Sequence, residues 1–444
     1  MDQKNQKKKT IYMTAAILAA VSGVLPLQHS WAMPSVYPTG VTVYNKDKAW
    51  NTDVLFSSAG QTRIINMDGK VLKTWNMQGS PAAMVDPKTI DGKKGVVGLQ
   101  ISNIEASKVP GMEGVGLVPG VAPKEVNRSF GLVDWNGQVM WQWEGTQEVG
   151  AALQNHDWSR LPNGNILILS DKVRQDSSFK TKKIIDDIIY EVNPQGKVIW
   201  QWSATDHLNE FGFTPEQMKL VKNSDSPDYL HMNDMQVLGP NKWEKAGDQR
   251  FAADNVIFSS RNANFTAIID HKTGHIVWRI GPNYPALAAG EAGTLPRPVD
   301  QISGQHDPHM IPEGLPGAGN ILMFDNQGEA GYPRAERALL GGSRVLEINP
   351  VTKEIVWEYT GRMSGQSDFS FFSPYISSVQ RLPNGNTLID EGINSRFFQV
   401  TPKGEIVWEY MAPYTRKTVK GAPRVPTYRI QAVPSDWLPA SYGF

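Results

Sequence analysis

The chain has 444 residues, of which 40% are hydrophobic and 20% charged, with 44 Lys and Arg against 44 Asp and Glu, and no Cys. This composition is too apolar for a disordered chain, and zero net charge argues against a nucleic-acid partner, whose binding depends on a basic face. The absence of Cys excludes disulfides, thiolate catalysis and Cys-ligated zinc.

Residues 1–32 are typical of a secretory signal peptide. A cluster of Lys residues precedes a mostly apolar stretch from Ile11 to Leu27, and Ser30-Trp31-Ala32 offers small residues at the positions read for cleavage. A membrane anchor is the alternative reading, but the apolar stretch is short for a span and is interrupted by Gly and Pro. We therefore expect a periplasmic protein with no stable membrane anchor after signal removal, in which residues 33–444 form a single domain.

The rest of the chain repeats one unit six times. Each copy has a short apolar strand, a turn rich in Asn, Asp and Gly, and a second alternating strand that ends in Trp. The six hairpins end at Trp75, Trp143, Trp202, Trp278, Trp357 and Trp408. In at least four copies another hairpin comes first, in residues 160–169, 236–258, 310–324 and 381–389.

Two hairpins make a four-stranded sheet, and six such sheets predict an all-β fold, a six-bladed β-propeller of four-stranded blades around a central channel. Insertions are expected between and within blades, and the insertion at 205–225 is predicted to contain a helix. The segment 426–444 includes an alternating stretch that begins at Thr427 and can supply the strand that closes the ring.

Alignment of the repeats places several polar residues at the start of the innermost strand. His156, His306 and Ser377 each stand five residues before the apolar residue that opens the next turn, and His231 opens the equivalent stretch of the fourth unit. Innermost strands line the channel of a propeller. We therefore expect these side chains to face one another across the axis.

A guanidinium is predicted at the same mouth of the channel. Arg261 ends the second strand of its hairpin, at the end where the first strand begins, and Asn233 and Ser378 lie close to the aligned position. Arg offers a rigid fork to a tetrahedral oxyanion, and imidazoles can act as nucleophile or proton carrier. This set suits transfer of a sulfuryl or phosphoryl group, and the sequence has no Walker-type loop for nucleotide phosphates.

Structural roles are weighed beside these catalytic ones. A histidine in a strand is more often a satisfied polar residue than a catalyst, and His207, His271 and His275 are interpreted as structural. His309 alternates to the opposite face of its strand from His306. The repeated Trp residues are interpreted as core.

Several segments resemble the bacterial arylsulfate sulfotransferase (arylsulfotransferase) family. A His-x-Asn, a Ser-Ser-Arg and a Gln-His element follow one another on the six-blade repeat, and together they are specific. The similar segments are residues 37–50, 156–169, 231–238, 259–281, 304–310, 319–326 and 380–392.

The resemblance implies an enzyme that moves a sulfuryl group from an aryl sulfate donor to a phenolic acceptor, without an adenylyl-sulfate or other cofactor and without a metal. It implies that His306 is the nucleophile and that the other channel residues are His156, His231, Asn233 and Arg261. Our hypothesis for the mechanism is that His306 forms a sulfohistidine and that His156 is the proton donor and base. The sulfuryl oxygens would be held by Arg261, Asn233 and His231. A homodimer is compatible with the resemblance.

Two other classes of protein stay open. A propeller enzyme that uses a His-ligated metal or a quinone would also place histidines in its channel, although Arg261 would repel a metal ion there. A non-catalytic periplasmic scaffold would need no cluster of His and Arg in the channel.

Overall fold

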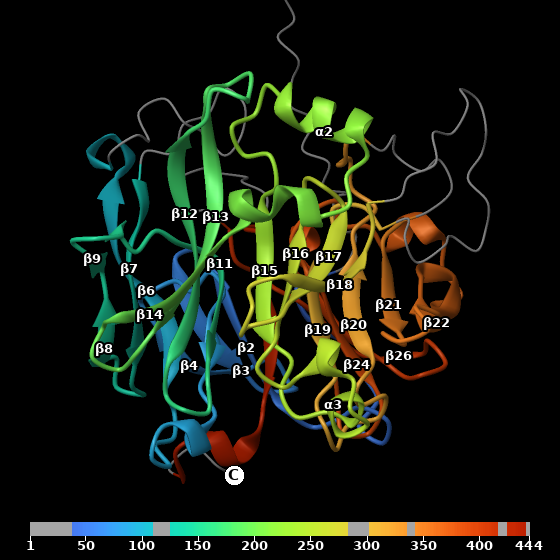
Figure 1. Ribbon diagram of the computed structural model, residues 1–444. Helices are drawn as coiled ribbons and strands as arrows, with labels where there is room; N and C mark the ends of the chain where they lie inside the picture. The colour runs from blue at the N-terminus through green and yellow to red at the C-terminus, as the bar shows by residue number, and fades with distance from the viewer. Residues whose placement is uncertain (1–37, 110–124, 283–301, 335–341, 416–423, 441–444) are drawn as a thin grey trace, which may run out of the picture. The chain divides into compact units, whose positions relative to one another are not determined.

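The computed structural model describes residues 38–109, 125–282, 302–334, 342–415 and 424–440. They form antiparallel sheets arranged as six blades, which confirms the predicted six-bladed β-propeller (Figure 1). The predicted signal peptide, residues 1–32, lies outside the described residues. Within the described ranges, no helix is both long and apolar enough to cross a membrane.

The first three blades run from inner to outer strand as follows. Blade 1 is β27 (Ile430–Val433), β2 (Asp53–Ser58), β3 (Gln61–Ile65) and β4 (Val71–Trp75). Blade 2 is β5 (Ala83–Met84), β6 (Val97–Glu105), β7 (Glu125–Val133) and β8 (Val139–Trp143), followed by the short pair β9 (Gly145–Thr146) and β10 (Gly150–Ala151). Blade 3 is β11 (Gln154–Arg160), β12 (Ile166–Gln175), β13 (Lys183–Val192) and β14 (Val198–Ser203).

The other three blades repeat this order. Blade 4 is β15 (Met232–Val237), β16 (Val256–Ser260), β17 (Phe265–Ile269) and β18 (Ile276–Ile280). Blade 5 is β19 (His306–Met310), β20 (Ile321–Asp325), β21 (Arg344–Ile348) and β22 (Ile355–Tyr359). Blade 6 is β23 (Ser378–Arg381), β24 (Thr387–Glu391), β25 (Arg396–Val400) and β26 (Ile406–Met411), with β1 (Gly40–Tyr44) as a fifth, outermost strand.

Strands from both ends of the described chain close the ring. The C-terminal β27 pairs with β2 as the innermost strand of blade 1, and the N-terminal β1 pairs with β26 on the outer edge of blade 6. The first blade is therefore completed only when the last strand is in place.

The six repeated Trp residues connect neighbouring blades. Each indole N–H donates to a backbone carbonyl in the outer turn of the next blade. The pairs are Trp75 to Asp134, Trp143 to Gly196, Trp202 to Gly274, Trp278 to Pro350, Trp357 to Pro402 and Trp408 to Met67, at 2.7–3.2 Å. Five of these side chains are buried, as expected for core residues, and Trp357 is half-buried. The last pair links blade 6 to blade 1.

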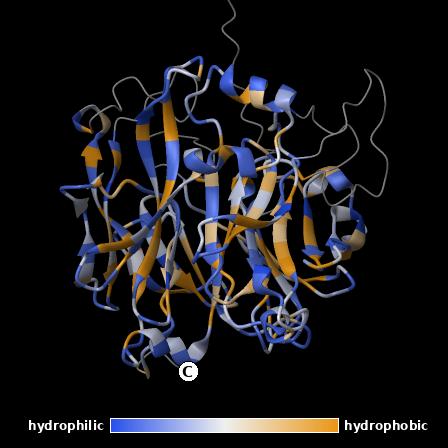
Figure 2. Cartoon of the chain, viewed as in Figure 1, coloured by the Kyte–Doolittle hydropathy of each residue, from blue (hydrophilic) through white to orange (hydrophobic). Residues whose placement is uncertain are grey.

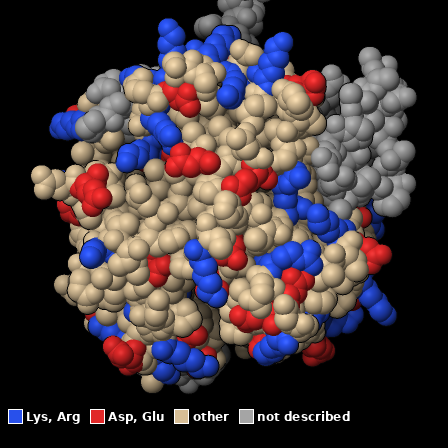
Figure 3. Space-filling model, in the orientation of Figure 1, with Lys and Arg blue, Asp and Glu red and all other residues tan. Residues whose placement is uncertain are grey.

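Hydrophobic side chains concentrate in the strands, and the connecting turns are hydrophilic (Figure 2). Strands β16, β17, β20 and β21 are buried along their whole length, whereas in the outer strands β4 and β8 only the terminal Trp is buried. The core therefore lies between adjacent blades. On the face seen in Figure 3, acidic and basic side chains are interspersed.

Short helices lie in the connections. The insertion predicted to be helical contains a 3-10 helix, η3 (Ala204–Glu210), and the helix α2 (Pro215–Lys222), which begins with a capping box between Thr214 and Gln217. The other helices within the described ranges are α3 (Lys242–Lys245) and the 3-10 turns η1 (Pro87–Thr89), η2 (Ala106–Lys108), η4 (Gln249–Phe251), η5 (Gly361–Ser364), η6 (Asp368–Ser370), η7 (Gly392–Asn394) and η8 (Ser435–Trp437).

Candidate active site

Polar side chains occupy the same position in the innermost strands of five blades, at the channel. Strand pairing aligns the blades, and in blades 3 to 6 and then blade 1 this position is occupied by His156, Asn233, His306, Ser377 and Tyr428. The sequence alignment placed His231 there, which is wrong by two residues because Asn233 occupies the position and His231 precedes β15.

The backbone at this level departs from regular strand geometry. His156, His231 and Asp307 have φ angles of 62°, 53° and 56°, and the ladders of β11, β15 and β19 shift register beside them. Bulges re-aim side chains, and non-glycine residues with positive φ cluster at functional sites. The inner strands therefore turn their polar residues toward the channel mouth at a local cost in backbone energy.

His156 has one ring nitrogen bound and one free. Its Nδ1 lies 3.0 Å from the Tyr428 hydroxyl, and that hydroxyl donates its single hydrogen to the Asn233 carbonyl at 2.6 Å. Nδ1 therefore carries the proton, and Nε2 is left as a bare acceptor, which is buried and has no hydrogen-bond partner among the described residues. Burial, aided by the nearby imidazoles of His231 and His306, lowers the pKa of His156 well below 6.5.

His306 is held in the same tautomer by different partners. Its Nδ1 lies 2.9 Å from the Gly304 carbonyl and 2.8 Å from Asn326 Oδ1, and both are acceptors because the Asn326 amide nitrogen donates elsewhere. Nδ1 therefore carries the proton, and Nε2 accepts a hydrogen bond of 3.1 Å from the Ile376 N–H. Burial, followed by the charge of Arg261, lowers the pKa of His306 to about 3.

His231 is paired with a buried carboxylate. Its Nδ1 lies 2.5 Å from Asp228 Oδ2, and its ring centroid is 4.5 Å from that of His156. A second acid near this pair is Asp171. Burial, followed by the charge of Asp228, raises the pKa of Asp171 to about 7, while His231 and a hydrogen bond from Asn155 act in the opposite direction. His231 is therefore positioned by a carboxylate in the way an imidazole is in a catalytic dyad.

Arg261 directly follows β16 and lies beside these imidazoles. Its backbone N–H donates to the His231 carbonyl at 3.1 Å, and its Nη1 donates to Asn262 Oδ1 at 2.8 Å. Burial lowers the pKa of Arg261, although the charge of Asp228 opposes the shift. The effect of its charge on His306 places the guanidinium near that imidazole.

The remaining predicted residues have hydrogen bonds within the protein. Asn233 donates from Nδ2 to the Gln305 carbonyl at 2.7 Å, while its buried Oδ1 has no partner within the described part of the chain. Ser377 donates to Ser373 Oγ at 2.8 Å and accepts from a backbone N–H. Ser378 Oγ accepts from the Ile430 N–H at 3.1 Å, which leaves its own hydrogen available.

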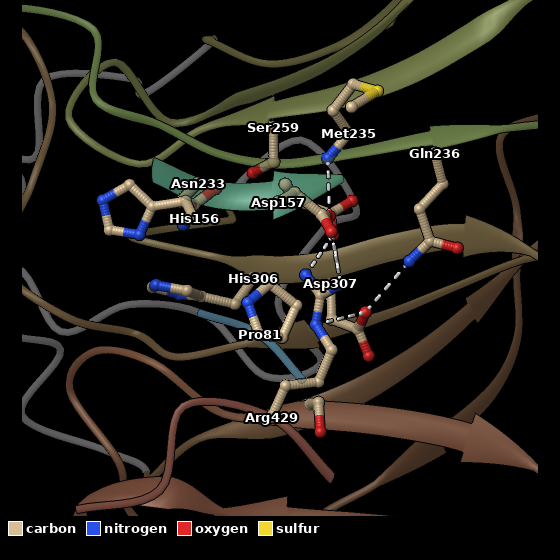
Figure 4. A network of polar contacts seen from close by, with 12 residues as sticks. Pro81, His156, Asp157, Asn233, Met235, Gln236, Ser259, His306, Asp307 and Arg429 are labelled. Atoms are coloured by element: carbon tan, nitrogen blue, oxygen red, sulfur yellow. Dashed lines mark hydrogen bonds and ion pairs between the residues drawn. The ribbon is translucent and has the colours of Figure 1, made fainter. Parts of the chain in front are cut away.

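Sequence reasoning missed an ionic cluster one residue further along the inner strands. Arg429 of the closing segment pairs with Asp157, Asp234 and Asp307 at 3.0, 2.5 and 3.4 Å (Figure 4). The three carboxylates come from blades 3, 4 and 5, and all four side chains are buried or nearly so. One cation thus connects the closing segment to three other blades below the imidazoles.

These carboxylates also connect successive inner strands. Asp157 accepts the Met235 N–H at 2.9 Å, and Asp307 accepts the Val379 N–H at 2.8 Å, so each binds the backbone of the following blade. A signal for this cluster was present in the sequence, because an Asp follows the aligned position in three consecutive units. Tyr428 carried the same five-residue spacing, because it stands five residues before Val433-Pro434 in the segment expected to close the ring, but the sequence analysis did not align this segment with the other units.

The assembled groups fit transfer of an anionic group. Two neutral imidazoles have their Nδ1 protonated, so that Nε2 carries the lone pair. A third imidazole, of His231, and the partly buried guanidinium of Arg261 supply donors. Positioning and charge stabilisation of this kind are what group transfer from a sulfate ester requires.

A family model described as Arylsulfotransferase (ASST) matches residues 129–420, which is more than half of the chain and includes every residue predicted for the site. No curated protein shows a significant match to the chain.

Solved structures with a similar fold have low sequence identity. A protein of unknown function from Bacteroides caccae has a TM-score of 0.43 at 11% identity, covering 86% of this chain and 98% of that one. A catalytically inactive virginiamycin B lyase from Staphylococcus aureus, with quinupristin, has a TM-score of 0.39 at 11% identity, covering 85% and 90%. A europium-containing methanol dehydrogenase has a TM-score of 0.38 at 12% identity, covering 84% and 69%. Similarity at this level carries no information about activity.

Proposed function

Because the chain belongs to the arylsulfotransferase (ASST) family and is thus an enzyme that transfers sulfuryl groups, we propose that it moves the group from an aryl sulfate to a phenol through a sulfohistidine on His306. The observation that carries this proposal is the fixed tautomer of His306. Gly304 and Asn326 hold the proton on Nδ1, and a pKa of about 3 keeps the ring neutral, so Nε2 is the nucleophilic atom.

In the first step the Nε2 lone pair of His306 attacks sulfur. The bond between sulfur and the aryl oxygen breaks, and its electron pair leaves with the phenolate. The imidazole keeps its Nδ1 proton, and the resulting positive ring is stabilised by the two oxygen acceptors at 2.9 and 2.8 Å. Arg261 supplies positive charge to the sulfuryl oxygens, aided by the remaining donors of His231 and Asn233.

In the second step an acceptor phenol takes the group. Its hydroxyl proton passes to the free Nε2 of His156 while its oxygen attacks sulfur, and the sulfur–nitrogen bond returns its electron pair to His306. The buried and unpartnered Nε2 of His156 supports its role as base. Protonated His156 then gives this proton to the phenolate that leaves from the next aryl sulfate, so that the proton balance closes over the catalytic cycle.

The backbone amide of Ile376 occupies the nucleophilic nitrogen of His306 before the substrate binds. Its N–H donates to Nε2 of His306 at 3.1 Å, so the incoming sulfate must displace it from the lone pair. An amide displaced by a short distance faces the sulfuryl oxygens, to which it can donate. The positive φ of Ile376, 55°, and of Ser377, 95°, identifies this loop as one that stores backbone strain.

A chromogenic aryl sulfate, supplied with and without phenol, tests this function. We expect the wild type to release the coloured phenol faster when the acceptor is present. His306→Ala should reduce turnover by at least about a thousandfold, as loss of a nucleophile does. His271→Ala, on an outer hairpin, is the matched control and should retain full activity. Full activity of His306→Ala would contradict the assignment, and no colour release from wild type with several aryl sulfates would favour a scaffold.

We also propose that the protein is exported to the periplasm. The basic and apolar segments of residues 1–32 support this location. Fractionation of producing cells followed by N-terminal sequencing tests it, with Met33 as the expected first residue. Recovery of uncleaved chain from the cytoplasm would contradict it.

A further inference from the structure

Three side chains that could ligate one metal ion lie on the outer part of the propeller, away from the channel position of the inner strands. His207 and Glu210 belong to η3, and His275 lies in the outer turn of blade 4. The Nδ1 atoms of His207 and His275 lie 2.9 and 3.1 Å from the same Glu210 oxygen, Oε1. The three ligand atoms lie within 4.8 Å of one another, and this is the one group of this kind among the described residues.

Two of the three ligands are held in place by their own neighbours. The second oxygen of Glu210 accepts the Ile276 N–H at 2.8 Å. The His207 ring stacks on the Trp202 indole, with centroids 4.9 Å apart and planes 14° apart, and that indole donates to the Gly274 carbonyl. Partners of this type orient ligating side chains. His275 is 69% exposed and can adjust to an ion.

The donor set is one that borderline divalent ions prefer. Two imidazole nitrogens and one carboxylate oxygen form a three-residue zinc set, and a water can take the fourth position on the exposed side of His275. Ligand bonds of about 2.0–2.1 Å in a tetrahedron place ligand atoms roughly 3.3 Å apart. The two nitrogen–oxygen separations, 2.9 and 3.1 Å, are already close to that value.

Two of the three cations that line the adjacent surface pocket of about 720 Å³ are paired with acids. Arg174 pairs with Asp206 at 2.7 Å, and Lys272 lies 3.9 Å from Asp254. The third cation, Lys172, lines the pocket together with His207. The Glu210 carboxylate therefore offers an ion negative charge, and two of the neighbouring cations are offset by acids of their own.

We propose that His207, Glu210 and His275 bind a divalent transition-metal ion, with Zn²⁺ as its best-matched member, which fastens the insertion of blade 3 to blade 4. The fastened segment runs from η3 through α2 to Asp228 and His231, so the ion anchors the start of the segment that ends at the channel. This site is separate from the sulfuryl-transfer chemistry and does not depend on it.

Calorimetric titration of the EDTA-treated full-length protein with Zn²⁺ tests the proposal. We expect one site per chain in the wild type. His275→Ala and Glu210→Gln should weaken it by more than the roughly 10–100-fold that loss of an outer partner costs. Because His275 is exposed, its replacement leaves the fold intact, and a thermal melt without metal verifies this. Co²⁺ absorption in the visible range reports four-coordinate geometry in the wild type and its loss in the variants.

Two controls separate this site from other histidines. His271→Ala, on the same hairpin but paired with Glu191 at 3.0 Å, should bind Zn²⁺ as the wild type does, and so should His156→Ala in the channel. The proposal is overturned if the wild type binds no Zn²⁺, if His275→Ala binds it as tightly as the wild type, or if His156→Ala loses it.

Discussion

At the scale of single residues, Tyr428 decides which nitrogen of His156 carries the proton. Its hydroxyl hydrogen is committed to the Asn233 carbonyl, so toward His156 it can only accept. A neutral imidazole without such a partner would exchange between tautomers, and in one of them Nε2 would no longer be a base. Tyr428 is therefore a positioning residue for the base of the proposed second step.

Replacement of Tyr428 by Phe removes the acceptor and keeps the ring. We expect kcat for transfer to the phenol to fall about 10–100-fold, within the contribution of general base catalysis, with little change in KM for the aryl sulfate. The pH–rate profile should shift as well, because the His156 environment changes. The matched control is Tyr359→Phe, which removes a buried hydroxyl bonded to Ser364 at 2.8 Å in blade 5 and should leave kcat unchanged. Equal kcat values for the two variants would contradict this role.

The lowered pKa of His306 makes folding stability depend on pH. The pKa is about 3 in the folded protein and about 6.5 in the unfolded chain, so between these values the unfolded chain binds the extra proton. The stability from this group is therefore complete above about pH 6.5 and is lost as the pH falls toward about 3.

His306→Gln, which cannot take up the proton, tests this dependence. Between about pH 6.5 and about pH 5 the wild type should lose about 2 kcal/mol more unfolding free energy than the variant, at about 1.36 kcal/mol per pKa unit. Urea unfolding at both pH values measures the difference. The same loss in both proteins would show that His306 does not titrate in this way.

At the scale of elements, the closing segment carries both Tyr428 and Arg429 into the channel. The Arg429 guanidinium is the common partner of three carboxylates, and two of them, Asp157 and Asp307, also bind inner-strand backbone. Closure of the ring and assembly of the site therefore depend on the same strand.

Arg429→Met removes the cation and leaves buried carboxylates without it. We expect the free energy of unfolding to fall by about 3–5 kcal/mol, as when one partner of a buried ion pair is removed. Arg128→Met is the control, because Arg128 pairs with Glu144 while both side chains are about half exposed (50% and 47%), and it should change stability by less than about 1 kcal/mol. Denaturant unfolding compares the two, and similar losses would show that the cluster contributes no special stability.

Among the six repeated Trp residues, we expect the two that differ most in burial to differ in their contribution to the free energy of unfolding. Trp408 is fully buried and bonds blade 6 to Met67 of blade 1 at 2.8 Å, whereas Trp357 is half-buried and bonds blade 5 to blade 6. Trp408→Phe leaves a buried carbonyl unsatisfied and should cost about 1–3 kcal/mol, with Trp357→Phe costing less. Thermal unfolding of both variants measures the order, and the reverse order would contradict a sealing role for Trp408.

At the scale of the whole molecule, the repeated sequence pattern predicted the blades. It did not predict the part of the site that comes from the strand closing the ring. Alternating strands, turn residues and terminal Trp recur within each unit, so the six hairpins were readable without contacts. The innermost strand of blade 1 comes from the other end of the chain, in the segment expected to close the ring, but its polar residues were not aligned with the other units, and so Tyr428 and Arg429 were missed.

His231 was placed two residues off because in its unit Leu238 is followed by Gly239-Pro240 and a long insertion instead of a Leu-Pro-Asn-Gly turn, although the five-residue spacing that holds for His156 and His306 selects Asn233, five residues before Leu238. Tautomers and the His207–Glu210–His275 cluster depend on side-chain contacts between blades, which no repeat specifies.

The proposed covalent intermediate is tested most directly by mapping it. The wild type is mixed with an aryl sulfate without acceptor, quenched under alkaline conditions, digested and analysed by mass spectrometry. We expect one sulfuryl group per chain, located on His306, which disappears when phenol is added before the quench. We also expect the group to accumulate in His156→Ala, where transfer to the phenol is slowed. A sulfuryl group on another residue, or its absence from wild type that is turning over substrate, would show that His306 is not the nucleophile.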